Sequence, residues 1–320
     1  MFSKMLHIVL GIFATSTLQS SSQQAEEINR LTNYFFWAAG FILLVVTILT
    51  AYMVIKYRHR QGITATKKQV NKKWEIVMIG VPTLLVAVFF YLTIKTMQNV
   101  LPPAEGKNPD VVVIGHQWWW QAIYPSHNVM AANEIHLPAG KTVLIKLRSA
   151  DVIHDWWVPE LGNKMDAVPG HENYLWLTIK KPGIYIGACS EFCGAQHAGM
   201  RLRIVAQSQQ DYDNWLTTQQ QSAALSNDTL VQTGAQLFAQ YTCGSCHRIN
   251  GTSANGEAGP DLTHIGSRST LLTGLMTNNP HNLKSWLKDP QQIKPGAHMP
   301  NFFLDEHSLK ALTAYLTALK

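Results

Sequence analysis

The densest group of soft metal-ligand side chains in the sequence lies in CSEFCGAQHAGM, from Cys189 to Met200. The thiols of Cys189 and Cys193 stand four residues apart, and the imidazole of His197 and the thioether of Met200 follow. Thiolate, imidazole and thioether donors together favour copper, because zinc sites rarely use methionine and hard cations prefer carboxylates. A blue-copper site needs one cysteine, so a second thiolate suggests two metal ions bridged by two sulfurs. His154 is the best candidate for a second imidazole.

Two simpler interpretations of this cysteine pair stay open on the motif alone. Cys189 and Cys193 could form a disulfide, or they could belong to a structural zinc site with two cysteines and two histidines. Neither interpretation gives a role to Met200 or to Glu191, which lies between the two cysteines. The motif therefore favours copper.

The other two cysteines of the chain lie in CGSCH, from Cys243 to His247. In this spacing Cys243 and Cys246 can form thioethers to the vinyl groups of a haem, and His247 can supply an axial imidazole. A redox-active disulfide is the alternative. The histidine directly after the second cysteine favours covalent haem attachment.

Two long apolar segments precede both motifs. Residues 34–55 hold no charge in 22 positions and residues 76–94 hold none in 19. As helices they would extend roughly 33 and 28 Å, enough to cross a bilayer. Seven basic residues and no acidic residue lie from position 56 to position 73, which predicts a cytoplasmic loop with both flanks outside. We therefore predict a transmembrane hairpin over residues 31–98.

The first 24 residues have the pattern of a signal peptide. Lys4 precedes a short apolar run, and small and polar residues follow. The formal net charge of the chain is +6, but the basic residues cluster beside the apolar segments, and no basic stripe is interleaved with aromatic residues. We therefore expect a membrane protein with no nucleic-acid partner.

Short β-rich runs separated by turn residues fill positions 107–206, which predicts a β-sandwich. The Cys189–Met200 motif would lie on one loop at the end of this sandwich. Residues 207–228 are polar; we expect a short helix around Trp215 and a flexible connection from Gln219 onward. A haem-binding domain over residues 229–320 would then be free to move relative to the sandwich.

Three motifs, GHQWWW, DVIHDWWVPELGNKMDAVPG and CSEFCGAQHAGM, follow the hairpin in this order. Over roughly residues 31–206 the chain resembles subunit II of haem-copper cytochrome c oxidases. The resemblance implies a cupredoxin-like domain that holds the binuclear copper A centre. The implied copper ligands are the bridging thiolates of Cys189 and Cys193, the imidazoles of His154 and His197, the thioether of Met200 and the backbone carbonyl of Glu191. The side chain of Glu191 would help to hold magnesium at the contact with subunit I.

The resemblance also suggests roles for two residues that bind no copper. Trp118 stands where the family places the aromatic residue through which electrons enter from cytochrome c, although an ordinary interface or core tryptophan is the alternative. Glu75 matches a carboxylate near the mouth of a proton channel, although an acid is favoured at a helix start in any case. Trp119 replaces the usual tyrosine and His171 replaces a usual arginine. These two departures concern the docking surface and the subunit contact.

Residues from about 229 to 320 resemble an all-α, class I cytochrome c domain. The resemblance implies that Met299, followed by proline, is the second axial haem ligand, with Met276 and His298 as alternatives. It also implies that Pro260 accepts a hydrogen bond from His247 and that residues 308–319 form the terminal helix.

These inferences together predict a caa3-type subunit in the bacterial inner membrane with its redox domains on the periplasmic face. It would pass electrons from a cytochrome c donor through haem c and copper A to subunit I, which reduces oxygen; subunit III is a further expected partner. The apolar segments contain no histidine, so the oxygen-reducing centre must lie in subunit I. A nitric oxide reductase that uses copper A and, less favoured, a copper-delivery factor are the alternative functions.

Overall fold

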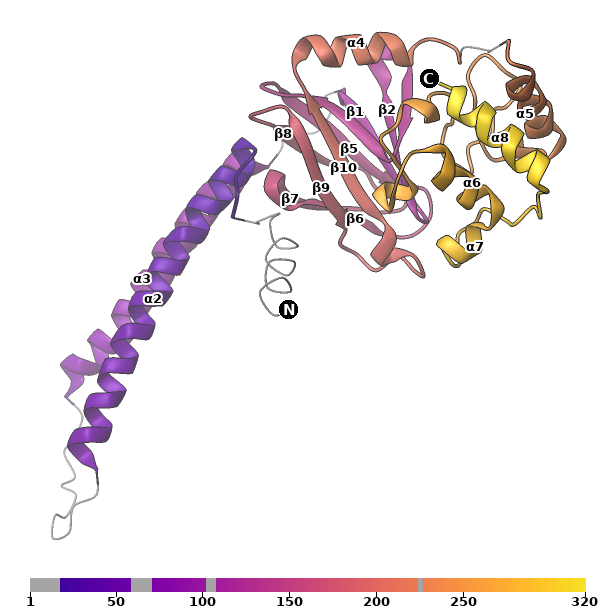
Figure 1. Cartoon of the computed structure of the whole chain (residues 1–320). Coiled ribbons are helices and arrows are strands. Elements are labelled where there is room, and N and C mark those ends of the chain that lie inside the picture. The colour runs from indigo at the N-terminus through magenta and orange to yellow at the C-terminus, as the bar shows by residue number, and fades with distance from the viewer. Residues whose placement is uncertain (1–17, 59–70, 102–107, 224–226) are drawn as a thin grey trace. The chain divides into compact units, whose positions relative to one another are not determined.

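The computed structural model describes residues 18–58, 71–101, 108–223 and 227–320. The chain divides into two units, residues 26–101 and residues 102–320 together with the segment up to Ala25. The first unit contains two long helices, and the second contains a β-sandwich and a helical domain (Figure 1).

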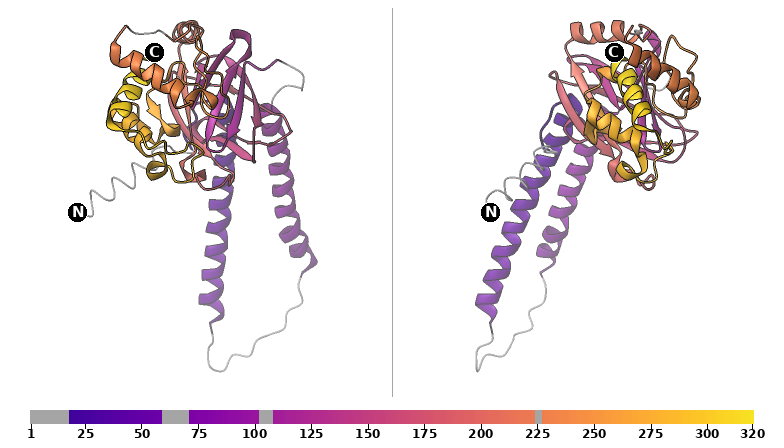
Figure 2. Two further views of the ribbon diagram at one scale, coloured as in Figure 1. Left: turned by 90° about the vertical axis from the view of Figure 1, so that its right-hand side faces the viewer. Right: turned by 45° about the vertical axis from the view of Figure 1, so that its right-hand side comes forward.

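Helices α2 (Gln23–Tyr57) and α3 (Lys72–Val100) form the first unit. Both are long and apolar enough to cross a membrane, and Figure 2 shows them as long, nearly straight helices. Asn71 caps α3 by accepting a hydrogen bond from the backbone N–H of Lys73. The rings of Phe35 and Phe89 stack at 4.1 Å, while most large apolar side chains point outward, as expected where lipid or a partner subunit covers them.

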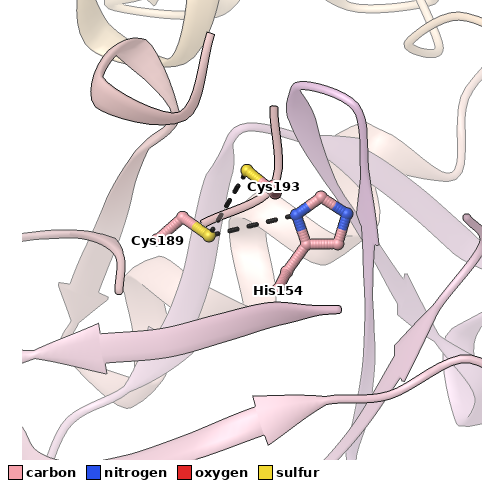
Figure 3. Close-up of side chains that lie close together, drawn as sticks. All are labelled: His154, Cys189 and Cys193. Atoms are coloured by element: carbon pink, nitrogen blue, oxygen red, sulfur yellow. Dashed lines mark hydrogen bonds between the residues drawn. The ribbon is translucent and has the colours of Figure 1, made fainter. Parts of the chain in front are cut away.

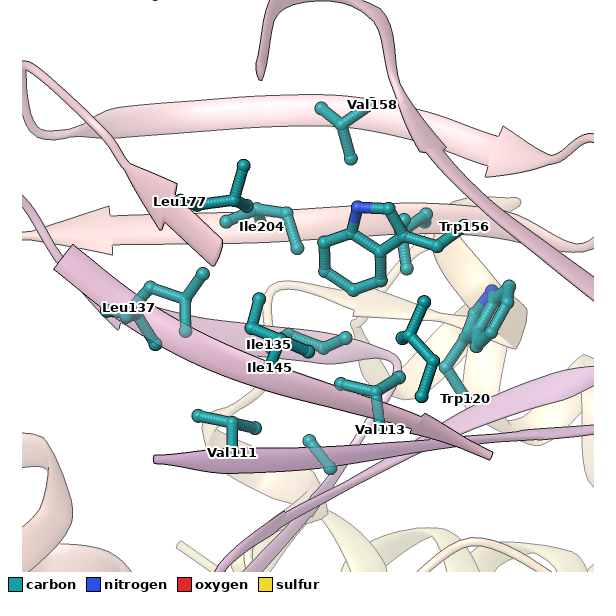
Figure 4. Packing of buried hydrophobic residues seen from close by; sticks show 14 of the residues in the cluster. Val111, Val113, Trp120, Ile135, Leu137, Ile145, Trp156, Val158, Leu177 and Ile204 are labelled. Carbon is teal, nitrogen blue, oxygen red and sulfur yellow. The ribbon is translucent and has the colours of Figure 1, made fainter. Parts of the chain in front are cut away.

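Two five-stranded sheets form the sandwich, in the orders β3-β2-β1-β5-β8 and β4-β10-β9-β6-β7. Alternating side chains from the two sheets make one core, which includes the fully buried Trp120 and Trp156 (Figure 4). The Tyr124 hydroxyl joins the sheets because it donates to the carbonyl of His136 and accepts from its N–H. The strands are β1 (Val111–His116), β2 (Trp119–Tyr124), β3 (Val129–Ala132), β4 (Glu134–Pro138), β5 (Thr142–Ser149), β6 (His154–Val158), β7 (Gly162–Ala167), β8 (Asn173–Thr178), β9 (Gly183–Cys189) and β10 (Arg201–Gln207).

The short segment before α2 is part of the sandwich. Ser22 is fully buried, pairs with Ile179 as an isolated β-bridge, and donates its hydroxyl to the carbonyl of Leu161 at 2.7 Å. The side chain of Gln24 accepts from the N–H of Thr178 at 3.1 Å. Most of the predicted signal peptide, residues 1–17, lies outside the described residues. Cleavage at the expected boundary, after residue 24, would remove the contacts of Ser22 and Gln24.

The expected helix around Trp215 is confirmed as α4 (Gln209–Gln219), which packs on the sandwich. The Trp215 ring stacks on His136 at 4.1 Å, and Leu216 is buried. The expected flexible connection includes residues 224–226, outside the described residues. The residues just before them make hydrogen bonds. The side-chain amide of Gln220 donates to the carbonyl of His127, and the N–H of Ala223 donates to the carbonyl of Asn250.

A second core, separate from that of the sandwich, holds the helical domain together. At Gly234, α5 crosses α8 so closely that an added Cβ would lie 2.2 Å from the carbonyl oxygen of Ala311. The helices are α5 (Thr229–Gln240), α6 (Pro280–Lys288), α7 (Pro290–Ile293) and α8 (Glu306–Ala318), with a small pair of strands β11 (Thr270–Leu271) and β12 (Met276–Thr277). The predicted terminal helix is confirmed as α8.

Candidate metal centre and haem site

Three buried side chains from two strands and one loop meet at the end of the sandwich. The sulfur of Cys189 lies 3.9 Å from Nδ1 of His154 and 3.8 Å from the sulfur of Cys193 (Figure 3). The sulfur of Cys193 is 3.6 Å from Nδ1 of His197 and 3.8 Å from the sulfur of Met200. All five side chains predicted as copper ligands therefore lie together.

The sixth predicted ligand atom, the carbonyl oxygen of Glu191, lies 3.2 Å from the sulfur of Cys189. Both thiols are free, and their separation is nearly twice the roughly 2.05 Å of a disulfide bond. The donors are two thiols, two imidazoles, a thioether and a carbonyl in a buried pocket, a set that fits copper better than zinc.

The β-strands fix this loop at both ends. Cys189 ends β9, and its N–H donates to the carbonyl of Met200, which directly precedes β10. His154 begins β6 and is fully buried. At Gly194 φ is +112°, and an added Cβ would lie 3.0 Å from the ring of Trp118. A side chain there would therefore push apart the loop and this tryptophan.

Asp151 orients His154, a contact that the motif analysis missed. Nε2 of His154 lies 2.7 Å from Oδ1 of Asp151, which leaves Nδ1 directed at the sulfurs. Burial lowers the pKa of His154, so its imidazole is neutral and able to bind a metal. Burial and the neighbouring Cys189 raise the pKa of Cys193 to about 12, so the thiolate form needs a bound cation. A carboxylate three residues before a ligating histidine was the available sequence signal.

Trp118 contacts the metal loop directly. Its Nε1 donates to the carbonyl of Cys193 at 3.0 Å, and the side-chain amide of Gln117 donates to the same oxygen at 2.7 Å. Trp118 is buried, and its ring centroid lies 5.3 Å from that of His298 in the helical domain. The neighbouring Trp119 instead stacks on His116.

The CGSCH motif forms a turn that directs His247 inward. Cys243 and Cys246 lie in and just after a 3-10 turn, with Cys246 exposed. Nδ1–H of His247 donates to the carbonyl of Pro260 at 2.8 Å, which confirms the expected bond and leaves Nε2 free for a metal. Burial lowers the pKa of His247, so the imidazole is neutral.

Several apolar side chains that pack against the core of the helical domain are only partly buried, as expected for the walls of a site that holds a flat apolar group. They include Tyr241, Cys243, Leu272, Met276, Met299 and Leu304. The donors and these walls fit a covalent haem. Met299 and Met276 are both available as the second axial ligand, whereas the ring of His298 lies against Trp118. Met299 remains the prediction.

Comparisons with known proteins agree with this geometry. Three family models match: cytochrome c oxidase subunit II, transmembrane domain, over residues 11–94; its periplasmic domain over residues 126–208; and cytochrome c over residues 231–320. A cytochrome c oxidase subunit 2 of Alkalihalophilus pseudofirmus is 34% identical over 293 residues, which cover 88% of this chain and 84% of that protein. A subunit of the same name from Bacillus subtilis is 29% identical over 95% of this chain and 92% of that protein. Another, from Bacillus sp., is 31% identical over 77% of this chain and 71% of that protein.

The chain belongs to the cytochrome c oxidase subunit 2 family. As a family member with a fused cytochrome c domain, it is the part of the oxidase at which electrons enter, and it works in a complex with subunit I. Helices α2 and α3 anchor it in the membrane and carry a periplasmic domain. Its domains imply copper A and haem c. The names of these relatives support neither a nitric oxide reductase nor a copper-delivery factor.

Three other predicted residues of this subunit 2 have exposed side chains. Glu75 is in the first turn of α3, exposed, beside a shallow depression that Ile79 and Thr83 also line. The side chain of Glu191 is exposed on the metal loop, and His171 is exposed in the turn between β7 and β8. In the part of the chain that the structure describes, no side-chain contact gives Glu75 or His171 a role.

Proposed function

We propose that this subunit binds two copper ions and one covalent haem c, and that it accepts electrons from an external cytochrome c for delivery to subunit I. The copper ligands are those of the cluster: His154, Cys189, Cys193, His197, Met200 and the carbonyl of Glu191. The haem is held by Cys243, Cys246 and His247, with Met299 as the second axial ligand. The observation that carries the proposal is the meeting of all six copper donors at one end of the sandwich, where the side chains of His154, Cys189, Cys193 and Met200 are buried.

When bound, both groups are one-electron carriers. The chain's own residues prepare the copper site for this role. The sandwich buries the sulfurs of Cys189 and Cys193 and so keeps water away from them. Asp151 fixes the ring of His154, and the loop hydrogen bonds fix the positions of both thiols, so little rearrangement is needed when the charge of the site changes.

We also propose that the carboxylate of Glu191 contributes to a magnesium site at the contact with subunit I. A carboxylate is a suitable ligand for this hard cation. Two further carboxyls lie nearby, those of Asp155 and Asp166. Burial, a hydrogen bond that protonated Asp155 donates to Asp166, and the charges of Asp166 and Glu191 raise the pKa of Asp155 to about 7. A cation beside Glu191 would relieve this concentration of acidic groups. Subunit III is proposed as a further partner.

The test is the composition of the full chain, purified in detergent after expression with haem maturation and copper. We expect two copper ions and one covalent haem per chain, and an electron paramagnetic resonance spectrum in which one unpaired electron is shared by two copper nuclei. A single isolated copper, a bound zinc or a Cys189–Cys193 disulfide would contradict the proposal. The variant Cys193→Ser should lose the shared-electron signal and keep the haem.

A further inference from the structure

A buried carboxylate of the sandwich is bonded almost entirely to the helical domain. Glu134, at the start of β4, is 6% exposed. Its Oε1 accepts from the hydroxyl of Ser269 at 2.5 Å and from the N–H and hydroxyl of Thr270 at 2.9 and 2.7 Å. Its Oε2 accepts from the N–H of Ser269 at 3.1 Å. Arg203 of β10 lies 3.6 Å away and balances the charge.

The same two domains also meet beside the metal loop. Nζ of Lys294 donates to the backbone carbonyl of Trp118 at 2.7 Å, and this lysine is only 5% exposed. The side-chain amide of Gln196 donates to the carbonyl of Pro295 at 2.6 Å. The hydroxyl of Thr273 donates to the carbonyl of Gly199 at 2.7 Å. Two segments of the helical domain therefore contact the loop that carries the copper ligands.

Burial of charged groups gives this contact its specificity. A carboxylate or ammonium removed from water is costly unless its hydrogen bonds are complete, and here both Glu134 and Lys294 find their partners across the domain boundary. If the domains separated, each group would exchange these partners for water. Ion pairs between two domains that move freely would stay exposed to water, whereas Glu134 and Lys294 are buried.

We propose that Glu134 anchors the helical, haem-binding domain in a fixed dock on the copper domain, so that His298 and Lys294 cover Trp118 and close it to external proteins. This inference rests on the proposed function. With Trp118 covered, an external one-electron donor would be oxidised at the haem domain and not at Trp118. It replaces the expectation of a freely moving haem domain with a docked one.

Hydrogen exchange of the full chain, purified in detergent with its oxidase partner, tests the anchor without relying on activity. In the native chain the amides of Ser269 and Thr270 should be protected by Glu134. We expect Glu134→Ala to speed their exchange about tenfold or more, while strands β1 and β5 and helix α8 keep their protection. Glu172→Ala is the matched control, because this exposed carboxylate pairs with Lys146 inside the sandwich. Equal protection in Glu134→Ala and the native chain would overturn the proposal.

A second variant covers the case in which Glu134→Ala fails to fold. Thr270→Val keeps the shape of the side chain and removes one donor to Glu134 from the other side of the dock. Hydroxyl-radical labelling of Trp118 should rise several-fold in either variant and stay unchanged in Glu172→Ala. Labelling of Trp118 in the native chain at the level of an exposed tryptophan would contradict the dock. Neither readout depends on copper or haem content, so a failed dock and a failed metal assignment are distinguishable.

Discussion

The indole Nε1 of Trp118 donates a hydrogen bond to the carbonyl oxygen of Cys193, 3.0 Å away. This bond joins the residue expected to receive electrons to a residue expected to bind copper. It also gives Trp118 a position that an ordinary core tryptophan would not need, because the ring lies between the metal loop and His298 of the haem domain.

Replacing Trp118 by phenylalanine should therefore slow electron delivery to copper while leaving the copper in place. We expect a decrease of about tenfold in turnover with reduced cytochrome c, which corresponds to roughly 1.4 kcal/mol in the barrier. Turnover and copper content should be measured on the same preparation. Trp119→Phe is the control, since Trp119 stacks on His116 of the sandwich. Unchanged turnover in Trp118→Phe would return Trp118 to a packing role.

Asp151→Asn should weaken copper binding although Asp151 binds no metal itself. The carboxylate holds the Nε2 side of His154, and such supporting contacts typically change metal affinity by about 10- to 100-fold. Copper retention against a competing chelator measures the effect. Glu172→Gln removes a carboxylate from the same sandwich and should have no effect. Equal retention in both variants would mean that packing alone orients His154.

The meeting of the proposed copper ligands was largely predictable from residue type and spacing. Cys189, Cys193, His197 and Met200 lie within one twelve-residue loop, so their proximity follows from the chain itself. His154 is 35 residues from Cys189, so the residues alone marked it only as the best candidate for a second imidazole, and the family resemblance then implied the same role. The sandwich and the membrane helices followed from hydrophobic patterns, and the terminal helix followed from the resemblance to cytochrome c.

The dock and the N-terminal contacts were not predictable in the same way. Glu134 and Thr270 are 136 residues apart, and neither lies in a motif. A glutamate in a strand is most often solvated, so its type gives no sign of a buried role. Likewise, the small polar residues before α2 are typical of a cleavage region, and only the fold gives Ser22 its partners. Long-range pairing of polar groups leaves no periodic pattern to read.

The second axial ligand of the haem can be decided by a pair of matched variants. Met299→Leu should remove the absorption band of methionine-ligated ferric haem while the covalent haem is retained through Cys243 and Cys246. Met276→Leu should keep the band, because we assign the ligand to Met299. The optical spectrum and the haem content of both variants give the answer. The reverse pattern would assign the ligand to Met276.

The Glu134 anchor of the dock should be complete near pH 7 and should loosen in acid. Burial opposes ionisation of Glu134, but hydrogen bonds from Ser269 and Thr270 hold its pKa below the ordinary value of 4.5. A depressed pKa in the folded state means that the stabilisation is complete above 4.5 and is lost as the pH falls through the lower, folded value. The groups that face Glu134 are Arg203, Arg268 and His136, and burial lowers the pKa of His136.

Labelling of Trp118 from pH 7 to pH 3 measures this dependence, with Glu134→Gln as the comparison. The native chain should become more reactive only at the acid end. The glutamine variant should show no such step at the dock, because it has no proton to gain. A step near pH 6 in the native chain would point to a histidine instead of Glu134.

Processing of the N-terminus should occur before Ser21. Ser22 is fully buried, donates to the carbonyl of Leu161 and accepts from the N–H of Ala25, so a chain cut after residue 24 would lose these bonds. Mass spectrometry of the mature protein should therefore find Ser21 and Ser22 retained. Ser22→Ala should lower the stability of the sandwich by about 1–3 kcal/mol, because the buried carbonyl of Leu161 loses this donor. Ser126→Ala, at an exposed site, should change stability by less than about 0.5 kcal/mol. A mature protein that begins at residue 25 would show that the sandwich is stable without this segment.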